Sequence, residues 1–250
     1  MKSFLLILLL IASSCVFAEP ATQPALRVFI RAGVKTHGPG QHDHPRLLKE
    51  YTELLNGRGI KCDGSLKFPT VEQLAVTDVL VMYAQHAGSM DEKQKADLTA
   101  YVGRGGGVVV LHDAVCSNDP QWFKTIVGGA WEDNHSKWHE GPMHLTFTDH
   151  DHPITHGISD FDLDDEIYWD LHLMPGAHVM ATSSPAKGGP TPQMWTYEKD
   201  SYRSFVWIQG HLYDNFLQPR FRSIILRGIA WTGKRDAEVF LNAEEKAALK

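Results

Sequence analysis

The sequence has few cysteines, no run of basic residues and no long apolar segment near its start. Only three cysteines occur among 250 residues, too few for the disulfide framework of a small secreted domain. The net charge is −6 without a basic block, so nucleic acid is not expected as a partner. The apolar segment Phe4–Ala12 is much shorter than the roughly 20 residues of a membrane-spanning helix, so no membrane span is expected.

The N-terminal pattern is typical of an export signal. Lys2 precedes the apolar segment, and Val16 and Ala18 occupy the positions that a signal peptidase prefers. We therefore expect a signal peptide over residues 1–18, a linker over 19–25, and a periplasmic or extracellular protein. Cys15 leaves a lipoprotein anchor open as an alternative, although Ala12 stands where leucine is usual in that motif.

The remaining chain alternates apolar runs with amphipathic segments. Strands that are apolar throughout and alternate with helices are typical of a parallel sheet covered on both faces. Ser89 followed by Glu92 resembles a capping box at the start of a helix. The expected strands are 26–31, 78–84, 108–112, 143–148, 178–183, 193–198 and 203–209, and the expected helices are 44–57, 89–102 and 219–231. We expect one α/β domain over 26–235 and a charged, helical tail over 236–250.

Histidines are abundant, with fourteen in the chain, and several follow the expected strands. Ligands of an open parallel sheet bind beyond the carboxyl ends of its strands. The residues at these positions are His37, His42, Asp43 and His44 after the first strand, His86 after the second, His112 and Asp113 after the third, and His211 after the last. Any single one is more simply a buried or loop histidine, but the convergence of His86, His112 and His211 indicates a site.

Two further segments carry candidate site residues. The stretch 131–144 places His135 and His139 beside Trp138. The spacing of these histidines fits two metal ligands on a helical face, yet the composition favours a loop, either facing substrate or solvated. The stretch 162–170 is a run of acids followed by aromatics. A solvated face is the ordinary interpretation, but Glu166 could turn inward and orient or activate the histidines.

Taken together, the motifs resemble those of the ThuA-like (trehalose-utilisation) family. The resemblance extends from about Arg27 to Arg235 and rests on HGPGQHDH, GGGVVVLHDA, VGGAWEDNHSKWH, DHPITHGI, DDEIY and the final GHLY…RGIAW. It implies a flavodoxin-like or class I glutamine amidotransferase-like three-layer α/β sandwich with a mainly parallel central sheet. It also implies sugar metabolism, since members are associated with oxidised disaccharides such as 3-ketotrehalose, and by extension it implies activity on 3-keto-glycosides.

The resemblance also indicates what the chain does not do. In the amidotransferases the glycine-rich strand ends in a tight turn that presents a cysteine nucleophile. His112 occupies that position here, Cys116 lies too far along, and Gly-x-Cys-x-Gly is absent. A glutaminase is therefore not expected. Cys62 and Cys116 could instead pair in an oxidising compartment.

The leading hypothesis is an exported enzyme that cleaves or converts oxidised (3-keto) glycosides through histidine acid/base or metal-assisted chemistry. The expected partner is a small carbohydrate or glycoside, and no nucleotide cofactor is expected. The candidate catalytic residues are His86, His112, Glu166 and His211, of which the three histidines could instead bind one divalent metal ion such as zinc. The candidate substrate contacts are His37, His42, Asp113, His135, Trp138, His139 and Tyr168. The alternative is a non-catalytic carbohydrate-binding protein on the same fold.

Overall fold

The computed structural model describes residues 23–249, and its centre is a nine-stranded sheet with the order β2-β1-β3-β4-β11-β10-β9-β6-β7. The first five strands in this order are mutually parallel. They are β2 (Lys61–Ser65), β1 (Arg27–Ala32), β3 (Val79–Tyr83), β4 (Gly107–Leu111) and β11 (Tyr202–Trp207). Their carboxyl ends therefore meet at one edge, which is where ligands of such sheets bind.

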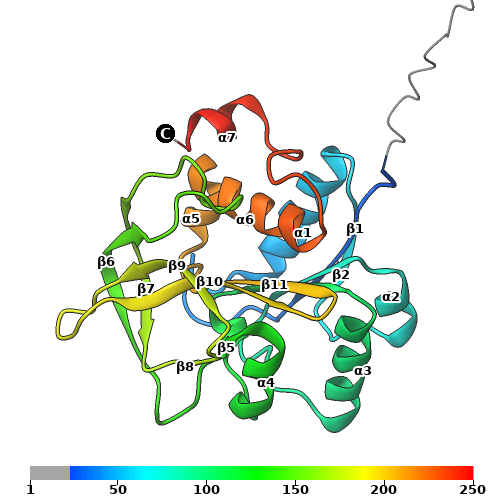
Figure 1. The fold of residues 1–250 in the computed structure, drawn as a ribbon, viewed down its shortest axis with the longest axis horizontal. Helices are drawn as coiled ribbons and strands as arrows, with labels where there is room; N and C mark the ends of the chain where they lie inside the picture. The colour runs from blue at the N-terminus through cyan, green and yellow to red at the C-terminus, as the bar shows by residue number, and fades with distance from the viewer. Residues whose placement is uncertain (1–22, 250) are drawn as a thin grey trace, which may run out of the picture.

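Helices cover both faces of the parallel part of the sheet (Figure 1). Helices α1 (His44–Gly57), α5 (Tyr213–Leu217) and α6 (Pro219–Thr232) lie on one face, and α2 (Val71–Val76), α3 (Glu92–Gly103) and α4 (Pro120–Val127) lie on the other. Side chains of β4 alternate between the two cores, with Val109 and Leu111 in one and Val108 and Val110 in the other. The three-layer α/β sandwich expected from the sequence is confirmed.

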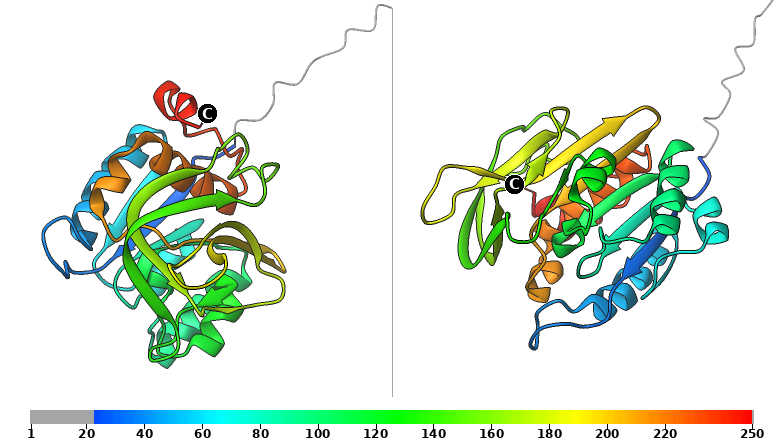
Figure 2. Two further views of the ribbon diagram at one scale, coloured as in Figure 1. Left: turned by 90° about the vertical axis from the view of Figure 1, so that its left-hand side faces the viewer. Right: turned by 90° about the horizontal axis from the view of Figure 1, so that it is seen from below.

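The other end of the sheet is antiparallel. It consists of β10 (Thr191–Lys199), β9 (His178–Ser183), β6 (Lys137–Phe147) and β7 (Phe161–Trp169). Strands β6 and β7 form a long curved hairpin (Figure 2). A separate short ribbon pairs β5 (Gly129–Ala130) with β8 (His172–Leu173). The hairpin supplies side chains to the site that the parallel strands alone could not provide.

Several expected elements are confirmed and others need correction. The helix over 44–57 and the strand over 178–183 have the expected bounds. Helix α3 is capped by Asp91 with Gln94. Ser89 instead lies in a turn, where its backbone N–H donates to the His86 carbonyl oxygen at 2.8 Å. Residues 137–142 were expected in a loop, but they belong to β6. Strands β2 and β7 and helices α2, α4 and α5 were not expected.

The C-terminal tail packs against the domain. Its helix α7 (Ala243–Ala247) buries Glu245, whose carboxylate accepts hydrogen bonds from Arg58 at 2.8 Å and Arg222 at 2.6 Å. Cys62 and Cys116 are free thiols. The expected signal peptide, with Cys15, lies outside the described residues. No helix within residues 23–249 has the length and apolar character of a membrane span.

Replacing Gly107 with alanine is expected to lower the free energy of unfolding by about 2 kcal/mol. A Cβ at Gly107 would lie 2.6 Å from the Thr232 carbonyl oxygen of α6, and backbone cannot move aside cheaply. A Cβ at Gly103 would have nothing within 4 Å, so Gly103→Ala is the matched control and should change stability by no more than about 1 kcal/mol. Urea denaturation of both variants measures this, and equal losses would contradict the packing argument.

Candidate functional site

The apolar strand β4 ends in a strained turn at His112. This residue has a φ of 54° and begins the short helical turn η1 (His112–Val115). A positive φ is uncommon for a residue with a side chain and is found mainly where function or packing requires it. The His112 side chain is fully buried, and its Nδ1 lies 2.8 Å from the Ile208 carbonyl oxygen. A carbonyl can only accept, so Nδ1 carries the proton and Nε2 presents a lone pair.

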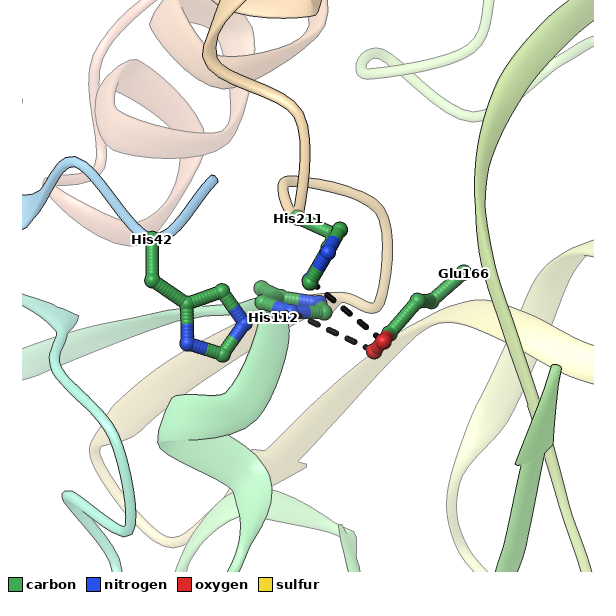
Figure 3. Close-up of side chains that lie close together, drawn as sticks. All are labelled: His42, His112, Glu166 and His211. Atoms are coloured by element: carbon green, nitrogen blue, oxygen red, sulfur yellow. Dashed lines mark hydrogen bonds and ion pairs between the residues drawn. The ribbon is translucent and has the colours of Figure 1, made fainter. Parts of the chain in front are cut away.

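Two more histidines converge on His112 (Figure 3). His42 comes from the loop after β1, and its backbone N–H donates to the His211 carbonyl oxygen at 3.0 Å. The ring centroid of His42 lies 4.8 Å from that of His112 and 4.7 Å from that of His211, and the centroids of His112 and His211 are 5.5 Å apart. Three imidazoles bound to one tetrahedral ion would have centroids about 5 Å apart.

Glu166 of β7 completes this group. Its carboxylate oxygens lie 3.5 Å from His112 Nε2 and 3.4 Å from His211 Nδ1 (Figure 3). One ligand atom from each of His42, His112, Glu166 and His211 lies within 4.8 Å of the others. Burial raises the pKa of Glu166 to about 8, and nearby carboxylates, Asp165 first among them, act in the same direction. We call these four residues the histidine–glutamate cluster.

The donor atoms of the cluster fit a divalent metal ion. Burial lowers the pKa of His42 to about 2 and that of His112 to about 4, so both rings are neutral near pH 7. His42 Nδ1 lies 3.0 Å from the Thr36 hydroxyl, which can donate to it, and 3.2 Å from an Asp113 oxygen. The two Nε2 atoms are 2.9 Å apart, so that without a metal the His42 Nε2–H can donate to the lone pair of His112 Nε2. A cation that replaces this proton would be held by both Nε2 atoms.

His211 supports the same interpretation. Both of its ring nitrogens are buried, and neither has a hydrogen-bond partner among the described residues. Burial also lowers its pKa. Buried polar atoms without partners are rare and cost free energy unless an ion or water satisfies them. The three neutral imidazoles are ligands that zinc and similar ions accept, and the Glu166 carboxyl group lies beside them.

Asp113 lies beside His42, and neither of its carboxylate oxygens has a hydrogen-bond partner among the described residues. It is buried, and its second oxygen lies 3.6 Å from Nε2 of His44, whose Nδ1 lies 2.9 Å from the Val34 carbonyl oxygen. The histidines around Asp113 outweigh burial and hold the pKa of its carboxyl below the usual value. A carboxylate behind a ligating histidine fixes the tautomer and increases the basicity of that ring. His44 was named as following the first strand but was not expected in the site.

Asp165 connects the hairpin to the loop that carries His211. Its carboxylate accepts hydrogen bonds from the backbone N–H groups of Gly210 at 3.1 Å, His211 at 3.0 Å and Glu166 at 2.7 Å. The Asn215 side chain donates a fourth at 2.6 Å. Asp165 thereby fixes the backbone of both His211 and Glu166, although sequence reasoning had identified only the acidic run around it.

A cavity of about 210 Å³ opens beside the cluster. Its walls contain several expected site residues, namely His37, His42, His86, Asp113, Trp138, Glu166 and Tyr168. His86 lines this cavity but does not belong to the histidine–glutamate cluster. His42 occupies the position expected for His86, because a backbone hydrogen bond joins the loop after β1 to His211.

Two of the expected substrate contacts do not line the cavity. His139 pairs with Ile167 across the hairpin, whereas Trp138 pairs with Tyr168. Neighbouring residues of a strand point to opposite faces, so His139 points away from the face that carries Trp138. His135 stacks on His172 with ring centroids 4.7 Å apart. The helical spacing of the two histidines was therefore misleading.

Glu140 belongs to the site and was missed in the sequence. It pairs with Glu166 across the hairpin, and its carboxylate lies 3.7 Å from His211 Nε2. Its other oxygen accepts a hydrogen bond from Gln41 at 3.2 Å. Recognition of 137–142 as a strand would have placed Trp138 and Glu140 on one face, because strand side chains alternate with a period of two.

Comparisons with known proteins identify the fold. A family model described as ThuA, trehalose utilisation, matches residues 27–232. A comparison with curated protein sequences found no match. Among solved structures, a protein described as ThuA-like from Bacteroides uniformis is 19% identical with a TM-score of 0.69, covering 86% of this chain and 94% of the other.

Two further structures are similar in fold. A β-galactosidase from Bacillus circulans sp. alkalophilus is 14% identical with a TM-score of 0.56, covering 86% of this chain and 32% of the enzyme. A protein from Thermoplasma acidophilum, described as one component of GMP synthase, is 11% identical with a TM-score of 0.52, covering 84% of this chain and 94% of the other. Identities this low are evidence for the shared fold alone.

Glu166 is expected to make the metal-free protein less stable as the pH rises from 7 to 8. The folded chain keeps a proton on Glu166 up to a pKa of about 8, whereas the unfolded chain loses it near 4.5. The contribution of Glu166 to the free energy of unfolding should therefore fall by about 1 kcal/mol per pH unit in this interval.

Urea denaturation in the presence of a chelator measures this slope against the Glu166→Gln variant, which has no proton to lose at this position. His42 and His112 titrate near 6.5 when unfolded, and they contribute to both proteins alike. The wild type should therefore lose about 1 kcal/mol per pH unit relative to the variant. Equal slopes for the two proteins would contradict a raised pKa of Glu166.

Replacing Asp165 with asparagine is expected to lower the free energy of unfolding by about 2–3 kcal/mol. The Asp165 carboxylate accepts hydrogen bonds from Gly210, His211 and Asn215, and the N–H₂ of an asparagine would place a donor against some of these donors. Asp164→Asn is the control, because the Asp164 side chain is exposed and its replacement should change stability by less than about 0.5 kcal/mol. Similar losses in both variants, measured by denaturation, would refute the connecting role of Asp165.

Proposed function

Because the chain belongs to the ThuA trehalose-utilisation family, we propose that it is an enzyme that cleaves oxidised (3-keto) glycosides. In this proposal His42, His112 and His211 bind one divalent metal ion, and Glu166 transfers the proton. The observation that carries it is the convergence of three neutral, buried imidazoles, two of them with Nε2 atoms 2.9 Å apart, next to a carboxyl group of raised pKa.

Three histidines suit a catalytic metal because they leave a coordination position open for substrate. The metal would act as a Lewis acid on the ketone oxygen of the sugar. The Thr36 hydroxyl contacts His42 Nδ1 at 3.0 Å, and the Ile208 carbonyl accepts the proton of His112 Nδ1 at 2.8 Å, so both Nε2 atoms stay directed at the same point. This fixed arrangement reduces the reorganisation needed when substrate binds.

The proposed reaction uses the acidity of the C–H group beside the ketone. Glu166, as carboxylate, removes the proton from C2, the C–O bond of the leaving group breaks at C1, and a C1–C2 double bond forms. The proton on Glu166 then passes to the leaving oxygen. Water adds across the double bond, with its oxygen on C1 and a proton on C2, so the overall reaction is hydrolysis. A base works best when its pKa lies near the working pH, as that of Glu166 does.

An ordinary glycosidase mechanism is less well supported by this site. That mechanism needs two carboxyl groups placed on either side of the bond to be cleaved. Asp165, the carboxyl next to Glu166 in the chain, already accepts four N–H hydrogen bonds and is fully buried. Glu140 pairs with Glu166 across the hairpin and does not line the cavity. The Cys116 thiol does not suggest a nucleophile either, because burial raises its pKa well above the usual value.

Export to the periplasm or the extracellular space is part of the proposal. It is supported only by the signal-like pattern of residues 1–18 in the sequence. A secreted or periplasmic enzyme of this kind would meet free glycosides rather than phosphorylated intermediates of the cytoplasm.

The purified protein is expected to bind one divalent metal ion and to hydrolyse 3-keto-glucosides. Elemental analysis after incubation with zinc measures the metal, and release of the leaving alcohol measures the reaction. His42→Ala, His112→Ala and His211→Ala should each lose the metal and roughly 100-fold or more in kcat/KM, because each removes one ligand. Wild-type turnover in all three variants would refute the proposal.

Glu166→Gln and His86→Ala separate the roles of the neighbouring residues. Glu166→Gln should keep the metal but lose roughly 100-fold or more in kcat, because a base is removed and no histidine ligand is lost. His86→Ala should keep the metal, because His86 lies outside the cluster. A wild-type protein that binds sugar but converts no keto-glycoside would instead support the carbohydrate-binding alternative.

A further inference from the structure

A second group of ligand atoms meets at the Nδ1 side of His42, opposite the histidine–glutamate cluster. His42, His44 and Asp113 are all buried, and one ligand atom from each lies within 4.8 Å of the other two. We infer that these residues bind a second divalent metal ion such as zinc, and that His42 bridges the two ions through its two ring nitrogens. This inference goes beyond the proposed function, because it concerns a different ion and does not depend on the reaction at the first.

Three atoms of this second group are buried without a hydrogen-bond partner among residues 23–249. They are both carboxylate oxygens of Asp113 and Nε2 of His44. A buried carboxylate without donors is costly, and buried polar atoms are otherwise nearly always satisfied by protein, water or an ion. Asp113 and His42 also line the cavity of about 210 Å³, which gives an ion a route to them. The unsatisfied atoms therefore point to a cation.

The ring of His44 directs a lone pair at Asp113. Its Nδ1 lies 2.9 Å from the Val34 carbonyl oxygen, which can only accept, so Nδ1 carries a proton. Its Nε2 lies 3.6 Å from Asp113 Oδ1, beyond the roughly 2.7–3.2 Å of an N–H···O hydrogen bond. A protonated ring bonded directly to the carboxylate therefore does not account for this contact. The Tyr83 ring packs edge-on against His44, with centroids 4.6 Å apart, and holds this orientation.

Nδ1 of His42 supplies the third ligand atom. It lies 3.2 Å from Asp113 Oδ2. When the His42 Nε2–H donates to His112 Nε2, Nδ1 has a lone pair and accepts from the Thr36 hydroxyl at 3.0 Å. A hydroxyl hydrogen can rotate away, so the Thr36 contact does not prevent Nδ1 from binding an ion.

The distances between these ligand atoms fit one tetrahedral ion. Atoms bound to zinc at about 2.0–2.1 Å lie roughly 3.3–3.4 Å apart. The distances of 3.2 Å and 3.6 Å from the Asp113 oxygens to His42 and His44 lie on either side of this value. Ions on the two nitrogens of one imidazole ring would be about 6 Å apart, so each can keep its own set of ligands.

Two ions can share His42 only if its ring gives up its remaining proton. A neutral imidazole has one N–H, and the first ion at Nε2 leaves that proton on Nδ1. The second ion displaces it to solvent and forms an imidazolate with a lone pair on each nitrogen. The charges balance, since the ion brings two positive charges and the imidazolate and Asp113 one negative charge each. Because it competes with a proton, the second ion should bind more weakly than the first.

A zinc titration against a chelating indicator counts the ions. The wild type should bind two zinc ions per chain, the second roughly tenfold or more weakly, so that only the first remains once free zinc is removed. Asp113→Asn and His44→Gln should each bind one, because each removes a ligand of the second ion, and the retained first ion shows that the variant is folded. One zinc ion per chain in the wild type, or two in both variants, would overturn the inference.

His86→Asn is the matched control for these variants. His86 lines the same cavity but belongs to neither group of ligands, and asparagine tolerates its positive φ of 54°. This variant should keep both zinc ions. Loss of the weaker ion here as well would mean that it does not depend on His44 and Asp113 in particular, which contradicts the proposed site.

Copper tests the bridge in the unaltered protein. Copper(II) accepts the same imidazole ligands, and two copper(II) ions joined by an imidazolate couple their unpaired electrons. The electron paramagnetic resonance signal should therefore rise with the first equivalent of copper and fall with the second. Two signals that simply add would show that His42 does not bridge the ions, and the inference would be wrong. Both tests use metal alone, so a failure to cleave glycosides would count only against the proposed function.

Discussion

The site depends on one buried carboxylate, that of Asp165. The three histidines come from the parallel half of the sheet, and Glu166 comes from the antiparallel hairpin. Asp165 joins these halves by accepting N–H hydrogen bonds from Gly210, from His211 and from the residue that follows it. A buried carboxylate is costly unless such donors surround it. The same bonds that satisfy it therefore fix the distance between His211 and Glu166.

Much of the fold can be predicted from the pattern of apolar residues. The strands that this pattern does not predict were missed for physical reasons. Strands β3 and β4 are apolar throughout, so their sequences predict that they lie in the core, where the structure places them. Strand β2, with the sequence KCDGS, forms the edge of the sheet, so its side chains carry no apolar signal. Residues 137–142 contain Gly141 and Pro142 and are mostly exposed. Their strand conformation comes from pairing with β7, which a local pattern does not reveal.

Site residues at strand ends could be predicted from the sequence. Site residues that depend on hydrogen bonds between loops could not. His112 and His211 closely follow the strand ends, so the parallel topology alone brings them together. His42 lies ten residues beyond the end of β1, and backbone bonds between residues 40–42 and residues 211–213 bring it into the cluster. His86, closer to its strand, was expected there instead and lines the cavity wall. Distance from a strand end is thus a poor guide once loops form their own hydrogen bonds.

Under the proposed function, the strained turn at His112 has a different role from the nucleophile turn of the amidotransferases that share this fold. A nucleophile at this turn must be free to form a covalent bond with the substrate. The His112 ring is instead fully buried and fixed by the Ile208 carbonyl, so it offers a stationary lone pair. Stationary lone pairs from several neutral rings hold an ion or guide a proton. Under the proposed function, the turn has kept its role of aiming one side chain into the site, and the replacement of cysteine by histidine changes what that side chain does.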